Sequence, residues 1–323
     1  MKFYSNSLLK IIRLNKRQWL AAGLLAGCFL WWPSYWVQNN YNRQGTLPRL
    51  SLSDQSEGIN WSAVYDLSDL NLSSQNVLLV EADDLFVVAA KQPDQVKSLA
   101  SLTKLMSLRL VRDSQLNLSS NIEVSPVSQI TDWQAYINGD EAVSQLPVRQ
   151  TETISVSQAL LASAVASANN VVLALVKKVS PDSDNFVYKM NKTASRLGLR
   201  QTVFADPTGL NPLNRGTARE MAVVATWAWQ DDFIRSAGAL PETVIKTDRN
   251  SYRLFNTNQL TGNKAWLIDA SKTGHLNEVG YNLVMRVKSS QDKVYLMVLL
   301  GAVSNEARQE DVGKIMTWLE SIS

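Results

Sequence analysis

The sequence predicts an α+β fold in which an antiparallel sheet is segregated from a mostly helical middle. Two pairs of short, apolar, β-rich runs lie far apart in the chain, at 77–80 and 85–90 and at 281–287 and 294–300. Within each pair a short polar turn separates the runs, which is typical of a β-hairpin. Hairpins favour antiparallel pairing, and helices kept apart from them indicate an α+β architecture. If both hairpins join one sheet, the two ends of the domain meet there.

Helices are predicted between and after the hairpins, over residues 98–111, 156–178 and 185–197 and from about Ser304 onward. The last helix carries an apolar stripe at spacing i, i+3, i+4 and i+7, formed by Val312, Ile315, Met316 and Leu319. The segment 156–178 is apolar nearly all round, so we expect it to be buried.

Composition limits the chemistry that the chain can perform. Its 323 residues are 45% hydrophobic, enough to build a substantial core without disulfide bridges. One Cys excludes a disulfide framework and thiolate zinc sites, and one His excludes multi-histidine metal sites. Catalysis is therefore expected to depend on Ser, Thr, Lys, Asn or carboxylate groups.

The formal charge of +3 is unevenly distributed along the chain. No Asp or Glu precedes Asp54, whereas seven of the 32 basic residues do, which leaves 25 basic against 29 acidic residues from that position onward. The basicity belongs to the N-terminus, and the rest of the chain has no cationic excess that would indicate nucleic-acid binding.

The N-terminal region predicts a membrane tether. After a basic leader over residues 1–18, residues 19–37 are uncharged and run WLAAGLLAGCFLWWPSYWV. As a helix this segment would span about 28 Å, close to the roughly 30 Å of a bilayer's hydrocarbon core. Arg13, Lys16 and Arg17 precede it and keep the N-terminus cytoplasmic, so everything after the span is expected on the extracytoplasmic side.

The same segment allows other interpretations. Residues 25–28, LAGC, resemble the bacterial lipobox, in which Cys28 is lipidated, whereas Cys28 can also be a small apolar residue of a membrane helix. A cleavable signal peptide is a further alternative, although no small-x-small site follows the apolar run. A signal anchor and a lipoprotein signal would both leave the domain attached to the membrane.

The next segment, residues 38–72, is polar and predicts a spacer that leads to a globular domain over residues 73–323. If it is flexible, its reach is roughly 30–35 Å, which would hold the domain near the membrane but off its surface. Apolar residues such as Val64 and Tyr65 allow the alternative that part of the spacer docks on the domain.

The first candidate catalytic motif pairs Ser101 with Lys104 at the start of a predicted helix. The i, i+3 spacing places the hydroxyl and the amine on one face of the helix. A buried Lys without a carboxylate partner loses its proton more easily, and it can then take the proton of the Ser as that residue attacks a carbonyl carbon. The spacing is common, since Ser7 and Lys10 in the leader match it too, so the motif is weak by itself.

The second motif pairs Ser167 with Asn169 inside the apolar run LLASAVASANNVVLALV. Polar side chains in such a helix would be buried without partners unless they face a cavity. A simple turn or kink is the structural alternative.

The third motif is Lys272-Thr273-Gly274-His275, just before the strand predicted at 281–287. A Gly lets a ligand approach the backbone closely, and a Lys beside a Thr hydroxyl suits a terminal carboxylate. Taken alone, His275 is more often a structural residue than a catalytic one.

In this order the three motifs resemble those of penicillin-binding proteins and serine β-lactamases, and most closely those of the D-alanyl-D-alanine carboxypeptidases of peptidase family S11. The supporting segments are ASLTKLM around Ser101, MNKTASRLGLRQTVFADPTGLNP at 190–212, TAREMA at 217–222, FNTNQL at 255–260 and KTGHLNEVGYNLV from Lys272. The resemblance covers roughly residues 75–320. It implies the β-lactamase/DD-peptidase-like fold, an antiparallel sheet flanked by helices beside an all-helical subdomain, with the site between them.

The resemblance also implies the catalytic roles. Ser101 would be the acylated nucleophile and Lys104 its general base. Ser167 would relay a proton to the leaving D-Ala nitrogen, and Asn169 would hold the amide on the acyl side. The oxyanion hole would use the N–H of Ser101 and an N–H near His275.

Substrate binding follows from the third motif by the same resemblance. Lys272 and Thr273 would bind the terminal carboxylate, and Gly274 and His275 would line the strand edge along which the peptide lies. The implied partners are peptidoglycan stem peptides and β-lactam antibiotics, and neither a metal nor an organic cofactor is implied.

Removal of the terminal D-Ala through an acyl-Ser101 intermediate is the leading hypothesis, and an endopeptidase that acts on cross-linked stems is the nearest alternative. A class A β-lactamase is disfavoured because no ExxxN-type deacylating Glu lies between the second and third motifs, and an inactive wall-binding homologue is disfavoured because the motif residues are intact. Two residues depart from the family pattern, Ala168 in place of Gly and Leu276 in place of Thr, and neither change removes a catalytic group.

Overall fold

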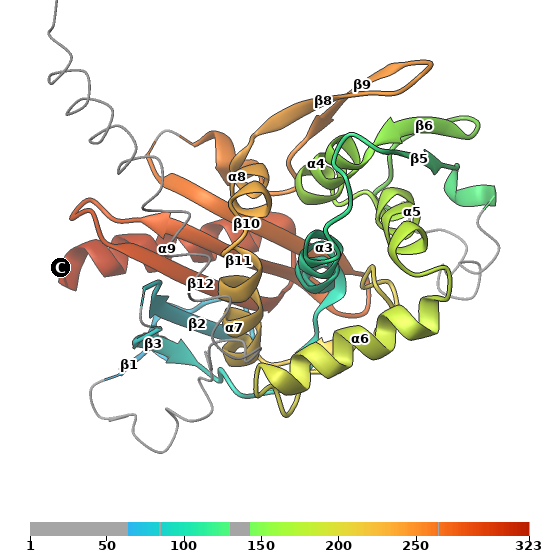
Figure 1. The fold of residues 1–323 in the computed structure, drawn as a ribbon. Coiled ribbons are helices and arrows are strands. Elements are labelled where there is room, and N and C mark those ends of the chain that lie inside the picture. The colour runs from blue at the N-terminus through green and yellow to red at the C-terminus, as the bar shows by residue number, and fades with distance from the viewer. Residues whose placement is uncertain (1–63, 84, 130–142, 264, 323) are drawn as a thin grey trace, which may run out of the picture. The chain divides into compact units, whose positions relative to one another are not determined.

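The computed structural model describes residues 64–83, 85–129, 143–263 and 265–322, and Figure 1 shows how their helices and strands are arranged. Three predicted features lie outside these residues: the basic leader, the membrane span with Cys28, and the first part of the spacer. Within the described residues, no helix combines the length and the apolar character needed to cross a membrane.

A six-stranded sheet forms the centre of the domain, with the strand order β1-β3-β2-β12-β11-β10. Its strands are β1 (Tyr65–Asp66), β2 (Asn76–Glu81), β3 (Val87–Lys91), β10 (Leu267–Leu276), β11 (Gly280–Lys288) and β12 (Val294–Ala302). Both predicted hairpins are confirmed, as β2–β3 and β11–β12. Because β12 pairs antiparallel with β2, the two hairpins join in one sheet, as expected.

The described part of the predicted spacer packs on this sheet. β1 pairs in parallel with β3, and Leu67 and Leu72 are buried in the core. Of the two alternatives for the spacer, docking on the domain therefore applies from Tyr65 onward.

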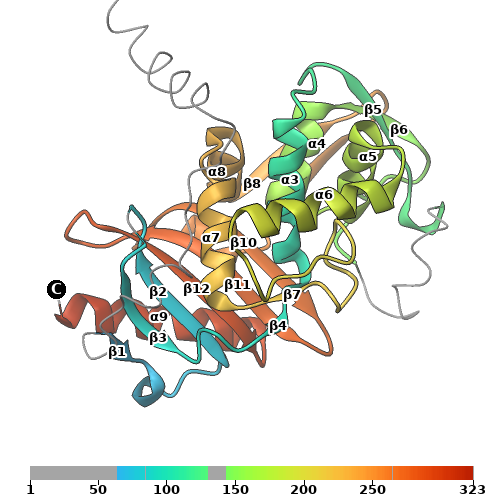
Figure 2. The same cartoon turned by 60° about the horizontal axis from the view of Figure 1, so that its bottom comes forward.

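Helices cover both faces of the sheet (Figures 1 and 2). One face packs against α9 (Asn305–Ile322), and the opposite face packs against α7 (Ala218–Ala228) and α8 (Asp232–Ala239). The apolar stripe predicted for the last helix is buried in the core beneath β11 and β12. Since the sheet is covered on both sides, both faces of its central strands are buried, as the four consecutive apolar residues 77–80 of β2 show.

A second group of helices lies beside the sheet and forms the rest of the domain (Figure 2). Its members are the 3₁₀ turn η3 (Ala100–Thr103), α3 (Lys104–Asp113), α4 (Val156–Ala166), α5 (Asn169–Val179) and α6 (Ser183–Arg196). The single helix predicted over 156–178 is wrong, because the chain breaks between α4 and α5. Ser167 takes a left-handed backbone conformation with φ of 58°, which ends α4. The structural alternative of a turn is therefore the correct local structure.

Three two-stranded sheets complete the fold: β4 (Lys97–Ser98) with β7 (Arg215–Gly216), β5 (Asn121–Val124) with β6 (Glu152–Ser155), and β8 (Glu242–Lys246) with β9 (Ser251–Phe255). Three further 3₁₀ turns are η2 (Ser68–Leu70), η4 (Val127–Gln129) and η6 (Gln259–Gly262).

The third motif precedes β11, as predicted, but it also lies within a strand of its own. Residues 272–275 belong to β10, the edge strand of the six-stranded sheet. The sequence pattern did not predict β10 because Ser271, Lys272 and Thr273 are polar yet buried, so the usual alternation of apolar and polar residues is lost.

Candidate active site

The first motif forms a hydrogen-bonded pair at the junction of η3 and α3. Lys104 Nζ lies 2.7 Å from Ser101 Oγ, which confirms that the i, i+3 spacing brings the two groups together. Nζ also donates to the backbone carbonyl of Thr208 at 2.6 Å. The side chain of Lys104 is fully buried, so the amine has no access to bulk water.

Burial decides the protonation of this amine. Removal from water disfavours the charged form and lowers the pKa of Lys104 to about 7, while the negative charge of Asp206 opposes the shift. A Lys with a pKa near neutrality is partly unprotonated under physiological conditions and can accept a proton from a hydroxyl that it contacts.

Two glycines lie against the backbone of the turn η3, which carries Ser101. A Cβ on Gly209 would lie 1.9 Å from the carbonyl oxygen of Ala100, and Gly209 also has a φ of +86°. A Cβ on Gly274 would lie 2.9 Å from the backbone nitrogen of Ser101. Only residues without a side chain allow β10 and the loop before Leu210 to approach the backbone of Ser101 this closely.

The second motif occupies the break between α4 and α5. The backbone N–H and the side-chain Nδ2 of Asn169 both donate to the carbonyl of Ser144, at 2.8 and 2.9 Å. Ser167 Oγ and Asn169 Oδ1 are buried yet have no hydrogen-bond partner among the described residues. Buried polar atoms of native proteins are normally paired, so these two are available to a ligand.

The third motif places a buried lysine amine at the edge of the sheet. Lys272 Nζ donates to the carbonyl of Thr273 at 2.9 Å, and Thr273 Oγ1 donates to the hydroxyl of Thr257 at 2.7 Å. Burial lowers the pKa of Lys272 well below its usual value, and the nearby charges of Lys104 and Arg308 act in the same direction.

Arg308 on α9 is a site residue that the motifs did not reveal. Its guanidinium donates to the carbonyl of Asn282 at 3.1 Å and to Asn305 Oδ1 at 2.6 Å. Burial lowers the pKa of Arg308 to about 10. A signal was present in the sequence, because Arg308 lies four residues before Val312 and so continues the buried stripe of the last helix.

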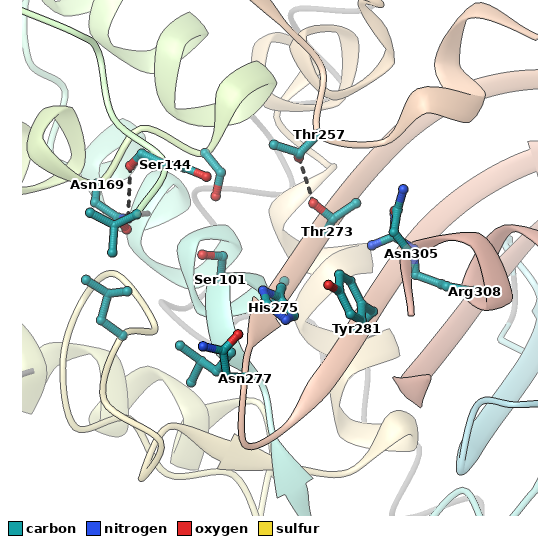
Figure 3. Close-up of a pocket in the computed structure, with 15 residues that line it drawn as sticks. Ser101, Ser144, Asn169, Thr257, Thr273, His275, Asn277, Tyr281, Asn305 and Arg308 are labelled. Carbon is teal, nitrogen blue, oxygen red and sulfur yellow. Dashed lines mark hydrogen bonds between the residues drawn. The ribbon is translucent and has the colours of Figure 1, made fainter. Parts of the chain in front are cut away.

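These groups face one cleft of about 420 Å³ between the helical part and β10. Figure 3 shows Ser101 between Asn169 and Ser144 on one side and Thr273 and His275 on the other. Of the predicted site residues, Ser101, Ser167, Asn169, Thr273, Gly274 and His275 line the cleft. Lys104 and Lys272 lie behind this lining and donate hydrogen bonds to two of its residues, Ser101 and Thr273.

The cleft has an apolar wall and an aromatic one. Val143, Leu210 and Leu276 line one part of it, and Leu210 and Leu276 belong to a small apolar cluster with Ala100. His275 stacks on Tyr281, with ring centroids 4.0 Å apart. Like Arg308, the residues Tyr281, Thr257 and Ser144 were not singled out from the sequence.

Comparisons with known proteins agree with this architecture. Residues 63–303 match the family described as D-alanyl-D-alanine carboxypeptidase, peptidase family S11. A D-alanyl-D-alanine endopeptidase of Pseudomonas aeruginosa is 30% identical over 77% of this chain and 78% of its own length. One of Escherichia coli K12 is 28% identical over 80% of this chain and 81% of its own length. The carboxypeptidase DacA of Haemophilus influenzae is 26% identical over 79% of this chain and 63% of its own length.

Solved structures show the same fold. Penicillin-binding protein 5 from Haemophilus influenzae superposes with a TM-score of 0.67 at 25% identity, covering 77% of this chain and 71% of that one. The DD-transpeptidase of Streptomyces K15 has a TM-score of 0.67 at 24% identity, covering 77% of this chain and 97% of that one. The predicted β-lactamase/DD-peptidase-like fold is confirmed.

The close approach of Gly209 to Ala100 leads to a prediction. Gly209→Ala should destabilise the domain, because an Ala at positive φ costs roughly 1–2 kcal/mol before the clash with Ala100 is added. Thermal unfolding measures the loss. The matched control is Gly313→Ala on α9, where the added Cβ meets only ordinary contacts and should raise stability by about 0.5–1 kcal/mol. Equal melting temperatures for Gly209→Ala and wild type would disprove the claim that position 209 has no room for a side chain.

Proposed function

The chain belongs to the D-alanyl-D-alanine carboxypeptidase family of serine peptidases, family S11, and on that premise we propose that it hydrolyses D-alanyl-D-alanine stem peptides of peptidoglycan through an ester on Ser101. The observation that carries the proposal is the 2.7 Å contact between Lys104 Nζ and Ser101 Oγ, made by an amine whose pKa is lowered to about 7. β-Lactams would acylate the same hydroxyl.

Acylation would begin with proton transfer from Ser101 Oγ to the neutral amine of Lys104. The oxygen attacks the carbonyl carbon of the penultimate D-Ala, and the N–H groups of Ser101 and His275 stabilise the oxyanion. Ser167 Oγ, which is buried without a partner among the described residues, relays the proton taken up by Lys104: it accepts that proton as it donates its own to the leaving D-Ala nitrogen. The C–N bond breaks as the ester on Ser101 forms. Water then hydrolyses the ester and regenerates the hydroxyl.

The charges of the site suit a substrate that ends in a carboxylate. Arg308 lines the cleft, Lys272 lies buried behind Thr273, and a bound carboxylate would favour the charged form of this amine. The hydroxyl of Thr273 could also bind the carboxylate. The rest of the peptide would lie along β10 past Gly274 and His275. Asn169 Nδ2 is occupied by Ser144, which leaves Oδ1 to accept the amide N–H on the acyl side.

A second candidate is the DD-endopeptidase, which cleaves between two cross-linked stems with the same site. The two D-alanyl-D-alanine endopeptidases described above match this chain over 78% and 81% of their own lengths, compared with 63% for the carboxypeptidase DacA. The larger matched share of the two endopeptidases, together with identities of 30% and 28% compared with 26%, favours this alternative.

The proposed substrate places the domain outside the cytoplasm, where peptidoglycan lies. Residues 19–37 would attach it to the membrane as a single span or, if Cys28 is lipidated, through a lipid. The uncharged run and the basic residues before it support this proposal.

Fluorescent penicillin tests the assignment of the nucleophile. We expect wild type to be labelled covalently and Ser101→Ala to show no label, because the acylated oxygen is gone. Lys104→Ala should also remain unlabelled, since the proton acceptor is lost. Labelling of Ser101→Ala would show that the nucleophile is misassigned, and normal labelling of Lys104→Ala would refute its role as base.

The pH dependence of acylation tests the state of Lys104. The neutral amine is the active form and its pKa is about 7, so the acylation rate constant should fall about tenfold per pH unit below that value and level off above it. Stopped-flow labelling with fluorescent penicillin gives this profile. A rate constant that is flat down to about pH 5 would contradict a lysine base.

Muropeptide assays separate the two candidate activities. Purified protein is incubated with pentapeptide and with cross-linked dimer, and the products are analysed by liquid chromatography and mass spectrometry. A carboxypeptidase releases free D-Ala from the pentapeptide, whereas an endopeptidase converts dimer to monomers. Ser101→Ala serves as the control for both, and turnover of neither substrate by wild type would refute both activities.

A further inference from the structure

We propose that Asp206 is a positioning residue for the base, acting through the backbone carbonyl of Thr208, which it holds against the amine of Lys104. The segment that does this, residues 204–214, is called here the Asp206 loop. The inference rests on the proposed role of Lys104 as the base that activates Ser101, and it adds a residue that belongs to none of the three motifs.

The carboxylate of Asp206 is the hub of the loop. Its Oδ1 accepts hydrogen bonds from the N–H of Thr208 at 2.6 Å, from the Thr208 hydroxyl, and from the N–H of Gly209 at 2.9 Å. Its Oδ2 accepts from the N–H of Asn211 at 2.7 Å and from Asn214 Nδ2 at 2.6 Å. Asp206, Thr208 and Asn214 are all buried. Five donors around one buried carboxylate fix the course of the backbone, because each would lose its partner if the loop moved.

The loop docks on α3 through two consecutive carbonyls. Ser107 Oγ donates to the carbonyl of Pro207 at 2.6 Å, and Lys104 Nζ donates to the carbonyl of Thr208 at 2.6 Å. The two donors are three residues apart on one helix, so successive turns of α3 hold successive residues of the loop. The position of the Thr208 carbonyl is therefore determined on both sides, by Asp206 within the loop and by α3 beneath it.

A carbonyl at this place orients the amine without competing for the proton. A neutral amine has two N–H donors and one lone pair, and a carbonyl oxygen can only accept. An N–H bound by Thr208 leaves the lone pair of Lys104 free to point toward Ser101 Oγ. After proton transfer the ammonium still donates to the same carbonyl, so one acceptor serves both protonation states.

The charge of Asp206 also acts on this amine. Among the charged groups described around Lys104, the carboxylate of Asp206 favours the ammonium form of that lysine. Lys272 on β10 is also a basic group, and the positive charges of Lys104 and of Arg308 on α9 disfavour its charged form. Loss of the Asp206 charge should thus make Lys104 easier to deprotonate. Asp206 would then have two separable effects, one on the position of the amine and one on its proton affinity.

Asp206→Asn tests both effects. The variant keeps the size of the side chain but removes the charge and one accepting oxygen. With fluorescent penicillin as the probe, we expect the acylation rate constant on the alkaline plateau to fall roughly 10- to 100-fold. The acid limb of the pH profile should move to lower pH. A residue that is merely structural would lower the amount of active protein without moving the limb.

The matched control is Asp231→Asn, the same chemical change at the N-cap of α8, where Asp231 accepts from the N–H of Ile234 and pairs with Arg112. It should leave both the rate constant and the acid limb as in wild type. Thr208→Val is a second variant that removes one donor to Asp206 and keeps its charge. It should slow acylation severalfold and leave the acid limb of the pH profile at the same pH as in wild type.

Each outcome decides the proposal. A folded Asp206→Asn with the rate constant and limb of wild type overturns it. If Asp206→Asn does not fold, Thr208→Val decides, because acylation at the wild-type rate would show that the loop's hydrogen bonds do not position the base. Absence of labelling in wild type would instead refute the proposed function, so the two failures can be told apart.

Discussion

The site depends on a lysine amine that is fully buried and that no carboxylate of the described residues contacts directly. An ammonium group is less stable in such surroundings than in water, so the amine loses its proton more easily. The lowered pKa is therefore a property of the packing around Lys104 rather than of the motif itself. Gly209 and Gly274 contribute to this packing, because they let the loop before Leu210 and β10 approach the backbone of Ala100 and Ser101 closely.

The arrangement imposes backbone conformations that the sequence would not choose locally. Ala100, directly before Ser101, and Ser167, at the break between α4 and α5, both have positive φ angles, of 48° and 58°. Such conformations cost of order 1–3 kcal/mol each and persist only where the surroundings enforce them. Here Ser167 lines the cleft and Ala100 directly precedes Ser101, which also lines it, and the sheet on one side and the helical part on the other supply the packing that holds them. The core thus stabilises the strained geometry of the site.

The sequence predicted those parts of the fold whose apolar residues form a continuous run or a regular stripe. The strands of the two hairpins are nearly continuous apolar runs because both faces of the sheet are covered, and the stripe of α9 has helical spacing because one face of that helix packs on the core. Prediction failed at β10 and at the α4–α5 break, where buried polar side chains interrupt those patterns. Residues of all three motifs line one cleft, whereas Arg308 lines it too but belongs to none of the motifs. The Asp206 loop is held by backbone N–H groups, which no residue pattern displays.

The electrostatics of the cleft connect catalysis to substrate binding. Lys104, Lys272 and Arg308 are all buried, and the charges of Lys104 and Arg308 lower the pKa of Lys272. The carboxylate of Asp206 opposes only the shift of Lys104, and it is already engaged by its own loop. In the proposed mechanism, a substrate carboxylate bound near Thr273 would favour the charged form of Lys272. Lys272 would then hold the proton, while Lys104 beside Ser101 could remain neutral. The different protonation states proposed for Lys104 and Lys272 thus depend on the positions of two negative charges, the carboxylate of Asp206 and that of the bound substrate.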